Sequence, residues 1–406
     1  MSEYFDELET RSSDQRAAAM AADLPAQLIN ASHNAPAMAA RLASVNVAQV
    51  VDRAALSTLP ILRKAELGAA QQASPPFGGF GTGANFAHVF QSPGPIYEPG
   101  GRGDDWFRLG RFLHATGVRA GDVVQNCFSY HLTPAGMMFE SAAKAVGATV
   151  FPAGTGQTEL QVQAAVQLGV TAYAGTPDYL KIILDKADEM GVDLSRITRA
   201  GVGGGALFPS LRAEYADRGI QCLQCYATAD LGNIAYESDA MEGMIVDEGV
   251  IVEIVTPGTG TPVPDGEIGE VIVTTLNRDY PLIRFATGDL SAVMAGISPC
   301  GRTNMRIKGW MGRADQTTKI KGMFVRPEQV AALVAAHPEI EKARIIALRD
   351  AERDTMLVQV ESNAGNLAAI SASVQDILKL RGEVEICAVG SLPKDGLLIE
   401  DRRKYD

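Results

Sequence analysis

Alternating strand and helix patterns between residues 105 and 226 constrain the fold of this chain more than any other feature. Apolar, strand-like runs such as "DVVQNCF", "ATVFPAG" and "TAYAGTP" are separated by helix-like runs such as "PAGMMFESAAKAVG" and "DYLKIILDKADEMG". Repeated strand–helix units of this length predict a parallel sheet with helices on its faces. The predicted fold class is therefore α/β.

The pattern changes towards the C-terminus. After residue 245 the runs "MIVDEGVIVEIV", "GEVIVTTL" and "YPLIRF" are rich in strand-forming residues, and the last ninety or so residues alternate helices with strands. A chain of 406 residues is too long for one ordinary core, so two or more domains are expected. We predict a large N-terminal domain, residues 1–314, with parallel α/β layers and a β-rich subdomain, and a small α+β domain, residues 315–406.

The N-terminal part differs from the rest. Residues 1–70 are rich in alanine and are expected to form helices that break near Pro25, Pro36 and Pro60. Residues 74–103 are dense in glycine and proline, which predicts a loop with short strands.

Composition narrows the functional classes. No apolar run approaches 18 residues, so no membrane span is expected, and the acidic, polar N-terminus is unlike a signal or transit peptide. Five cysteines are sparse and odd in number, as in a protein with reduced thiols, and a cytoplasmic location is expected. A net charge of −12 without a basic block argues against a nucleic-acid partner.

A series of motifs occurs in a fixed order from about residue 105 to the C-terminus. They are "GATVFPAGTGQTELQVQ", "AGVGGGALFPSLR", "CYATADLGNIAYES", "TTLNRDYPLIRFATGDLS" and "GWMGRADQTTKIKGMFVRPEQV". In this order the motifs resemble those of the phenylacetate–CoA ligases, a branch of the adenylate-forming superfamily of acyl-CoA synthetases. The resemblance implies a large adenylate-forming domain followed by a small mobile domain.

The resemblance also implies a nucleotide site. Asp289 would accept hydrogen bonds from both ribose hydroxyls, a role that suits an acceptor-only carboxylate. Arg313 would also contact the ribose, and Tyr226 would stack on the adenine with the backbone of Gly204 and Gly205 near its edge. Taken alone, "FATGDL" fits a strand that ends in a Thr-Gly-Asp turn. Together with "GRAD" further along the chain, it favours the nucleotide site.

Three other roles follow from the same resemblance. Ala227 and Thr228 belong to the nucleotide-binding motif, and Asp230 takes the place of its glutamate as a catalytic residue and Mg²⁺ ligand. Asp315 would be the hinge about which the small domain rotates. An N-cap or a simple linker is compatible with the same residue.

The acyl pocket is expected at "FSYHLTPAG". The segment occupies the place where the family lines its substrate cleft, and the candidate residues are Tyr130, His131, Leu132, Thr133 and Gly136. His131 would shield or polarise a carboxylate, or else be a packed, hydrogen-bonded side chain; the two interpretations are equally open. Aromatic and small side chains favour an aryl or compact acyl group over a long fatty chain.

Two segments depart from the family pattern. The family grips ATP phosphates with a Ser/Thr/Gly-rich loop that ends in lysine, whereas residues 90–101 read "FQSPGPIYEPGG". The three prolines have no N–H to offer, no lysine is present, and Glu98 would repel phosphate. The glycine loop at 78–84 is an alternative, but it also lacks lysine. Near the C-terminus Leu397 stands in the register of the catalytic lysine, with Lys394 and Lys404 as the candidates to replace it.

No zinc site is expected. Cys222 and Cys225 form a pair, but a structural zinc needs four ligands and the sequence has no second pair. The two cysteines are instead predicted to be buried on a strand that precedes Tyr226.

The leading hypothesis is an AMP-forming acid–CoA ligase that uses ATP, Mg²⁺ and coenzyme A and activates an aromatic or small carboxylic acid through an acyl-adenylate. One alternative retains nucleotide or acyl-adenylate binding and performs only thioester transfer. Another is a regulatory protein that binds nucleotide without turnover. Relatives often dimerise, and the helical N-terminal arm would suit a homodimer.

Overall fold

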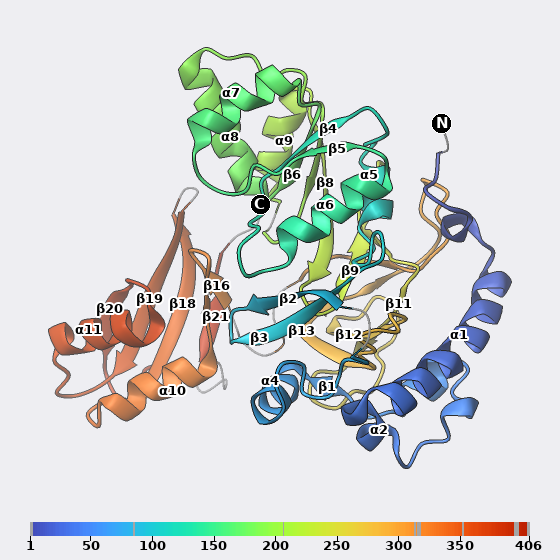
Figure 1. Cartoon of the computed structure of the whole chain (residues 1–406). Helices are drawn as coiled ribbons and strands as arrows, with labels where there is room; N and C mark the ends of the chain where they lie inside the picture. The colour runs from blue at the N-terminus through green and yellow to red at the C-terminus, as the bar shows by residue number, and fades with distance from the viewer. Residues whose placement is uncertain are drawn as a thin grey trace. The chain divides into compact units, whose positions relative to one another are not determined.

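The computed structural model divides the chain into two compact units, residues 1–311 and 312–406 (Figure 1). Each is described by itself. The structure describes residues 3–83, 86–205, 207–311, 314, 318–350, 353–393 and 398–403, apart from the side chains of residues 328 and 350.

A mixed sheet of strand order β14-β15-β10-β9-β8-β7-β6-β4-β5 organises the larger unit. Its parallel strands are β4 (Val123–Asn126), β5 (Thr149–Phe151), β6 (Ala172–Gly175), β7 (Arg199–Val202) and β8 (Gln221–Thr228). The helices that accompany them are α5 (Gly110–Ala115), α6 (Ala135–Ala145), α7 (Thr158–Leu168), α8 (Pro177–Met190) and α9 (Pro209–Asp217) (Figure 1). The predicted α/β fold class is confirmed.

β8 marks the end of the parallel part. It pairs with β7 in parallel on one side and with β9 (Gly232–Tyr236) in antiparallel on the other. The sheet then continues through β10 (Met244–Val246), β15 (Arg306–Ile307) and β14 (Val293–Met294). The turn between β8 and β9 therefore lies where the sheet changes from parallel to antiparallel.

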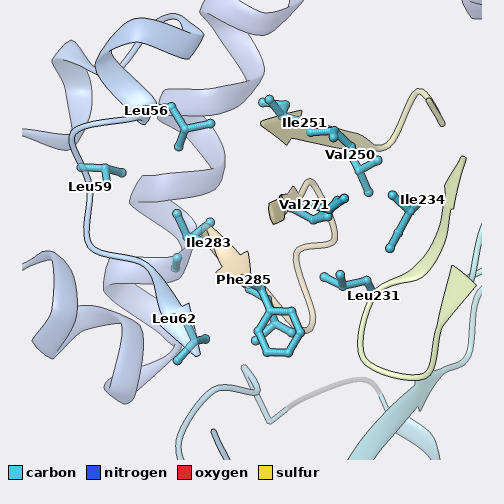
Figure 2. Packing of buried hydrophobic residues seen from close by; sticks show 14 of the residues in the cluster. Leu56, Leu59, Leu62, Leu231, Ile234, Val250, Ile251, Val271, Ile283 and Phe285 are labelled. Atoms are coloured by element: carbon cyan, nitrogen blue, oxygen red, sulfur yellow. The ribbon is translucent and has the colours of Figure 1, made fainter. Parts of the chain in front are cut away.

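A second sheet, of order β1-β13-β12-β11, forms the predicted β-rich part. Its strands are β1 (Leu62–Arg63), β11 (Val250–Val255), β12 (Gly269–Thr275) and β13 (Phe285–Ser291). Figure 2 shows Leu56, Leu59 and Leu62 of the N-terminal arm beside Ile283 and Phe285 in one buried apolar cluster. Burial of these side chains, at about 1.5–3 kcal/mol each, fixes the arm against the sheet.

The N-terminal arm is helical, as expected, but one predicted break is wrong. Its elements are η1 (Glu7–Thr10), α1 (Ser13–Asn34), α2 (Pro36–Leu42), η2 (Val47–Gln49), α3 (Arg53–Leu56) and α4 (Lys64–Ala73). α1 continues through Pro25, whereas Pro36 stands in the first turn of α2, where its missing N–H costs nothing. Leu24 and Leu28 are fully buried, so tertiary packing of α1 outweighs the cost of the internal proline.

The glycine- and proline-rich segment folds as a hairpin. β2 (Phe86–Ser92) pairs in antiparallel with β3 (Ile96–Gly101), and Phe90 lies opposite Glu98. The side chain of Gln71 on α4 accepts from the backbone N–H of Tyr97 at 2.8 Å and donates to its carbonyl at 2.7 Å. β3 is therefore tied to α4.

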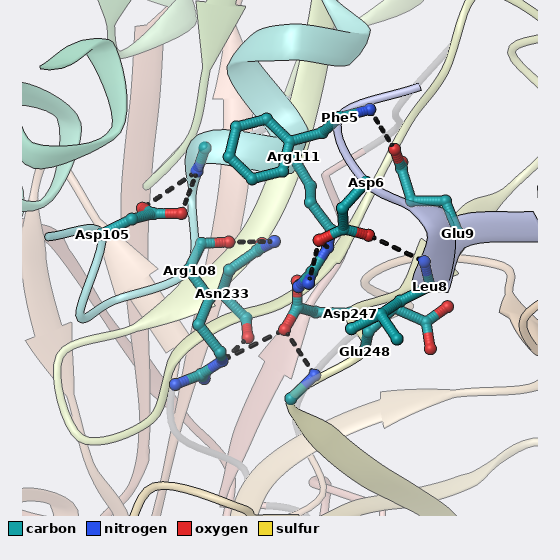
Figure 3. Close-up of polar contacts among 12 residues, drawn as sticks. Phe5, Asp6, Leu8, Glu9, Asp105, Arg108, Arg111, Asn233, Asp247 and Glu248 are labelled. Atoms are coloured by element: carbon teal, nitrogen blue, oxygen red, sulfur yellow. Dashed lines mark hydrogen bonds and ion pairs between the residues drawn. The ribbon is translucent and has the colours of Figure 1, made fainter. Parts of the chain in front are cut away.

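A polar network holds the β8–β9 turn from the other side (Figure 3). Arg108 donates to the carbonyls of Leu231 and Asn233, the latter at 3.1 Å, and pairs with Asp247 at 3.1 Å. Arg111 joins Asp247 to Asp6 of the N-terminal segment, with nitrogen–oxygen distances of 3.2 and 2.5 Å. These partly buried ion pairs fix the backbone that follows Asp230.

The smaller unit has the predicted α+β character. A sheet of order β20-β19-β18-β21 packs with two helices. The elements are β16 (Thr318–Ile320), β17 (Met323–Val325), α10 (Pro327–Ala336), β18 (Lys342–Asp350), β19 (Arg353–Glu361), α11 (Leu367–Leu378), β20 (Glu383–Cys387) and β21 (Ile399–Asp401).

Candidate nucleotide site

The candidate site begins at the carboxyl ends of β7 and β8. Because these strands are parallel neighbours, the loop after β7 and the residues at the end of β8 lie at one edge of the sheet, the usual place for ligands in such folds. Gly204 in the first loop has a φ of +70°, a conformation that favours glycine. β8 carries Tyr226, Ala227 and Thr228, and Thr228 Oγ1 accepts from the backbone N–H of Leu231 at 3.2 Å.

Asp289 projects from a bulge rather than from the tip of a strand. The pairing of β12 with β13 slips between Glu270 and Ile272, so three residues of β13, ending at Asp289, oppose the single residue Val271. Gly288 takes a φ of +72°, and Thr287 Oγ1 donates to the carbonyl of Val271 at 2.9 Å. The expected chain-reversing turn at this place is therefore a bulge, and β13 continues beyond it.

Both oxygens of the Asp289 carboxylate have protein donors. The Tyr226 hydroxyl donates to Oδ2 at 2.7 Å and the Trp310 indole N–H donates to Oδ1 at 3.1 Å, and the carboxylate is almost fully buried. The structure thus brings together two residues predicted for one nucleotide, Tyr226 and Asp289. Trp310 was not predicted as a site residue, although it stands just before "GRAD" in the same signature.

Asp230 is held by a lysine that sequence analysis did not select. Its Oδ2 accepts from Nζ of Lys64 at 2.8 Å, while its Oδ1 is buried and has no hydrogen-bond partner among the described residues. Lys64 is the first residue of α4, and its side chain is 42% exposed, so the ammonium group is reachable from solvent. Nothing in the sequence near "LRKAEL" indicates this contact, because its partner lies far along the chain.

Glu98 lies close enough to this pair for the charges of Asp230 and Lys64 to affect its pKa. It is fully buried on β3, and burial together with the charge of Asp230 raises the pKa of its carboxyl group to about 8, against an opposing effect of Lys64. Glu98 was predicted to repel phosphate from a loop, but it lies in strand β3, near the Asp230–Lys64 pair.

Arg284 does not face the site but holds the backbone next to it. Its guanidinium pairs with Glu253 at 3.0 Å and donates to the carbonyls of Leu59 and Gly260, and all of its donors point into the protein. It ties the N-terminal arm to the β-rich sheet just before β1. β1 in turn pairs with β13 in parallel, with Arg63 opposite Ala286, so Lys64 follows directly alongside the Asp289 bulge.

Four of the predicted acyl-pocket residues lie in the loop after β4, and Gly136 lies in the first turn of α6. Tyr130 and Gly136 pack together, since a Cβ at Gly136 would lie 2.9 Å from the Tyr130 ring, and the Tyr130 hydroxyl accepts from the Asn126 amide at 2.8 Å. His131 and Leu132 are exposed, and Leu132 has a φ of +61°. The loop is joined to β2 by the Gln91 N–H, which donates to the Leu132 carbonyl at 2.9 Å.

Several predicted residues lie outside the described part of the chain. These are Arg313, Asp315 and Lys394, together with Leu397 and Lys404. Their roles stay predictions.

The cysteines and acidic residues bear on metal binding. Cys222 and Cys225 are buried on β8, as predicted, and burial raises the pKa of both thiols. Among the described residues no three His, Cys, Asp or Glu side chains gather as a complete metal-binding group. An Mg²⁺ ion that arrives with a nucleotide needs only one or two carboxylates, and the buried, unpartnered Oδ1 of Asp230 fits such a ligand.

The match to a known family covers the part of the chain that carries Gly204, Tyr226 and Asp230. Residues 108–277 match the family of AMP-binding enzymes. The chain is 30% identical over 270 residues to a phenylacetate–coenzyme A ligase of Aromatoleum evansii, which covers 64% of this chain and 61% of that protein. The phenylacetate–coenzyme A ligase of Escherichia coli K12 is 28% identical over 316 residues, which covers 72% of this chain and 71% of the relative.

The match to the AMP-binding enzymes covers less than half of the chain, residues 108–277. Four of its relatives among characterised proteins are phenylacetate–coenzyme A ligases, and the resemblance read from the motifs is confirmed. The chain spans about three fifths of the length of three of them, 61%, 59% and 60%.

A crystal structure of 2-hydroxyisobutyryl-CoA ligase shares the fold. It superposes with a TM-score of 0.83 at 23% identity and covers 100% of this chain and 93% of that one. That protein was captured with its acyl-adenylate and CoA. In the described part of the present chain, no helix has the length and apolar character that a membrane crossing requires.

Proposed function

We propose that this chain is an AMP-forming acid–CoA ligase that activates an aromatic or small carboxylic acid. A carboxylate oxygen of the acid attacks the α-phosphorus of ATP, the bond to the β-phosphate oxygen breaks, and pyrophosphate leaves. The sulfur of CoA then attacks the acyl carbon of the adenylate, AMP leaves, and the thiol proton passes to solvent. The observation that carries the proposal is the buried Asp289 carboxylate, held by Tyr226 and Trp310 within an AMP-binding fold.

The roles of the nucleotide-binding residues follow from chemistry. Asp289 accepts from the ribose hydroxyls with the lone pairs left over from its two protein donors, because each carboxylate oxygen can accept more than one hydrogen bond. The hydroxyl bond of Tyr226 to Asp289 fixes the ring that stacks on adenine, and Gly204 and Gly205 allow the backbone to approach its edge. Arg313 adds a contact to the ribose.

The remaining roles concern phosphate and acid. Asp230 provides the carboxylate for Mg²⁺, which when bound supplies charge neutralisation for the triphosphate. Tyr130, Leu132, Thr133 and Gly136 line the acid site with His131 at its mouth. Lys394 contacts the reacting carboxylate, and Asp315 is the hinge of a small mobile domain, residues 315–406.

A second function keeps the nucleotide site but not the ATP chemistry. It is favoured by the hairpin at β2–β3, which has no lysine and buries the carboxylate of Glu98 where the family has a phosphate-gripping loop. Such a protein would bind AMP or an acyl-adenylate and transfer the acyl group to CoA, or bind nucleotide without turnover.

Pyrophosphate release separates the candidate functions. Mixing the chain with ATP, Mg²⁺ and a panel of aromatic and short-chain acids is expected to release pyrophosphate for at least one acid. If none elicits it, the ligase function fails. A preformed acyl-adenylate with CoA then distinguishes thioester transfer, which yields acyl-CoA and AMP, from binding alone.

We further propose that the protein is a cytoplasmic homodimer. A monomeric mass by light scattering at micromolar concentration would contradict the dimer.

A further inference from the structure

Glu98 is a buried carboxyl group that lacks a hydrogen bond of normal geometry. It lies in the middle of β3, its side chain is fully buried, and only Ser92 is near enough as a donor to oppose the rise of its pKa among the described residues. Burial of a carboxylate without a hydrogen bond or a counter-charge costs free energy, and in native proteins such a group usually has a functional role. A position on β3 could be filled by an apolar residue, so this glutamate requires an explanation.

The place that Glu98 faces holds the Asp230–Lys64 pair. β3 is tied to α4 by the two hydrogen bonds between Gln71 and the backbone of Tyr97, the residue next to Glu98. Lys64 begins the same helix two turns earlier, and its ammonium lies 2.8 Å from Asp230. Burial is the main cause of the raised pKa of Glu98, and Asp230 and Lys64 lie near enough for their charges to act on it in opposite directions.

The cluster has more carboxyl oxygen atoms than donors to satisfy them. Two carboxyl groups lie near one ammonium, and three of their oxygens, both of Glu98 and Oδ1 of Asp230, are buried without a hydrogen bond of normal geometry in the described part of the chain. The buried hydroxyl of Tyr280 lies near the same two carboxylates, whose charges help to raise its pKa. Oxygen ligands of this kind suit a hard divalent cation.

We propose that Glu98 is a second carboxylate ligand for a divalent cation bound with Asp230, and that the Lys64 ammonium holds the place of that cation in the free protein. This proposal depends on the proposed function in one respect only: the cation would reach the site together with the phosphates of the nucleotide. Mg²⁺ sites of this type use one or two carboxylates, with phosphate oxygens and water completing the octahedron.

The arrangement explains how a hairpin can replace a lysine-bearing loop. The β2–β3 segment offers no cation to the phosphates, but it offers a carboxylate to the metal that the phosphates bring. When the cation takes Asp230, Lys64 is released at the first turn of α4, next to the Asp289 bulge. Its side chain is exposed enough to turn towards phosphate, so the missing lysine is supplied from another part of the chain.

Mn²⁺ binding without nucleotide tests the proposal directly. Free Mn²⁺ is titrated by electron paramagnetic resonance against the full chain and against the variants Glu98→Gln, Asp230→Asn and Lys64→Met. The wild-type chain is expected to bind one Mn²⁺, and loss of either carboxylate should weaken it roughly tenfold or more. Lys64→Met should tighten binding, because it removes the cation that competes for Asp230.

A neighbouring ion pair provides the matched control. Arg63 and Glu270 form a contact of 3.0 Å beside the same β1–α4 junction, with side-chain exposures of 39% and 3%, against 42% and 1% for Lys64 and Asp230. Glu270→Gln should leave Mn²⁺ affinity unchanged. Circular dichroism of each variant at the titration temperature separates loss of a ligand from loss of the fold.

Three results would overturn the proposal. They are the absence of saturable Mn²⁺ binding by the wild-type chain, unchanged affinity in a folded Glu98→Gln variant, and weakening in Lys64→Met. The test is independent of the ligase assay. If the chain releases no pyrophosphate but binds Mn²⁺ through Glu98, the proposed function is wrong and this inference stands. If the chain is an active ligase and Glu98→Gln leaves Mn²⁺ affinity unchanged, the proposed function stands and this inference is wrong.

Discussion

Replacement of Glu98 by glutamine should change how stability depends on pH. Burial and the neighbouring Asp230 raise the pKa of Glu98 from 4.5 to about 8, while Lys64 and Ser92 oppose the shift. In the unfolded chain the carboxyl group ionises near its ordinary pKa. Between these values the folded protein keeps a proton that the unfolded chain has lost.

The sign and size follow from this difference in bound protons. A folded pKa above the unfolded one gives stability that is fully present below about pH 4.5 and is lost as the pH rises to about 8. The slope is about 1.4 kcal/mol per pH unit for one proton, so the total loss is on the order of 2–5 kcal/mol. Glutamine does not titrate, so the unfolding free energy of Glu98→Gln should rise relative to that of the wild type by this amount as the pH increases to about 8.

Tryptophan fluorescence can follow this change in the larger unit alone. The chain has two tryptophans, Trp106 and Trp310, and both lie within residues 1–311. Urea unfolding of wild type and Glu98→Gln at several values between pH 5.5 and 8.5 should show a difference in unfolding free energy that widens with pH.

The control is Glu66→Gln on α4. Hydrogen bonds from Arg41 and the backbone of Arg63 outweigh desolvation and lower the pKa of Glu66, so its contribution is lost only as the pH falls towards acid values and stays constant across this range. A difference between wild type and Glu98→Gln that does not change with pH would refute the reasoning, because it would mean that Glu98 is ionised in the folded protein throughout.

Three further predictions follow. Arg284→Met should lower the unfolding free energy of the larger unit by about 3–5 kcal/mol in urea titrations, since it leaves the buried Glu253 without its cation; an effect below 1 kcal/mol would contradict that role. Gly136→Ala should lower kcat/KM for the acid and leave AMP affinity unchanged, because a Cβ there would lie 2.7 Å from a backbone oxygen of the acyl-pocket loop; an equal loss of both would place the strain elsewhere. Cys300, half-buried with a pKa lowered by hydrogen bonds, should react with a disulfide reagent before Cys387, whose pKa is raised, and Cys300→Ser should remove the fast phase; a fast phase that survives would contradict the assignment.

The parallel layers could be predicted because their signals are local. Each strand and helix between β4 and β8 carries its own apolar pattern, and glycines such as Gly169 and Gly191 end the helices in left-handed conformations that the sequence indicates. Pro25 shows the limit of this reasoning. Its helix continues because α1 buries leucines against the β-rich sheet, a gain that no local signal reveals.

The site was predictable only in part. Tyr226, Asp230 and Asp289 stand in motifs and were identified from them. The bulge that aims Asp289 depends on the register between β12 and β13, which a single strand does not encode. Lys64 was missed because it is 166 positions from its partner in the sequence, and a lone lysine at a helix start is ordinary.

Binding of AMP to an Asp289→Asn variant tests the central claim most directly. Asp279→Asn is the matched control, because Asp279 accepts from the Trp106 indole at 3.1 Å, just as Asp289 accepts from that of Trp310. Calorimetry should show AMP affinity reduced roughly 10- to 100-fold for Asp289→Asn, as expected for hydrogen bonds to a charged acceptor, and unchanged for Asp279→Asn. Equal AMP affinity in wild type and a folded Asp289→Asn variant would contradict the account.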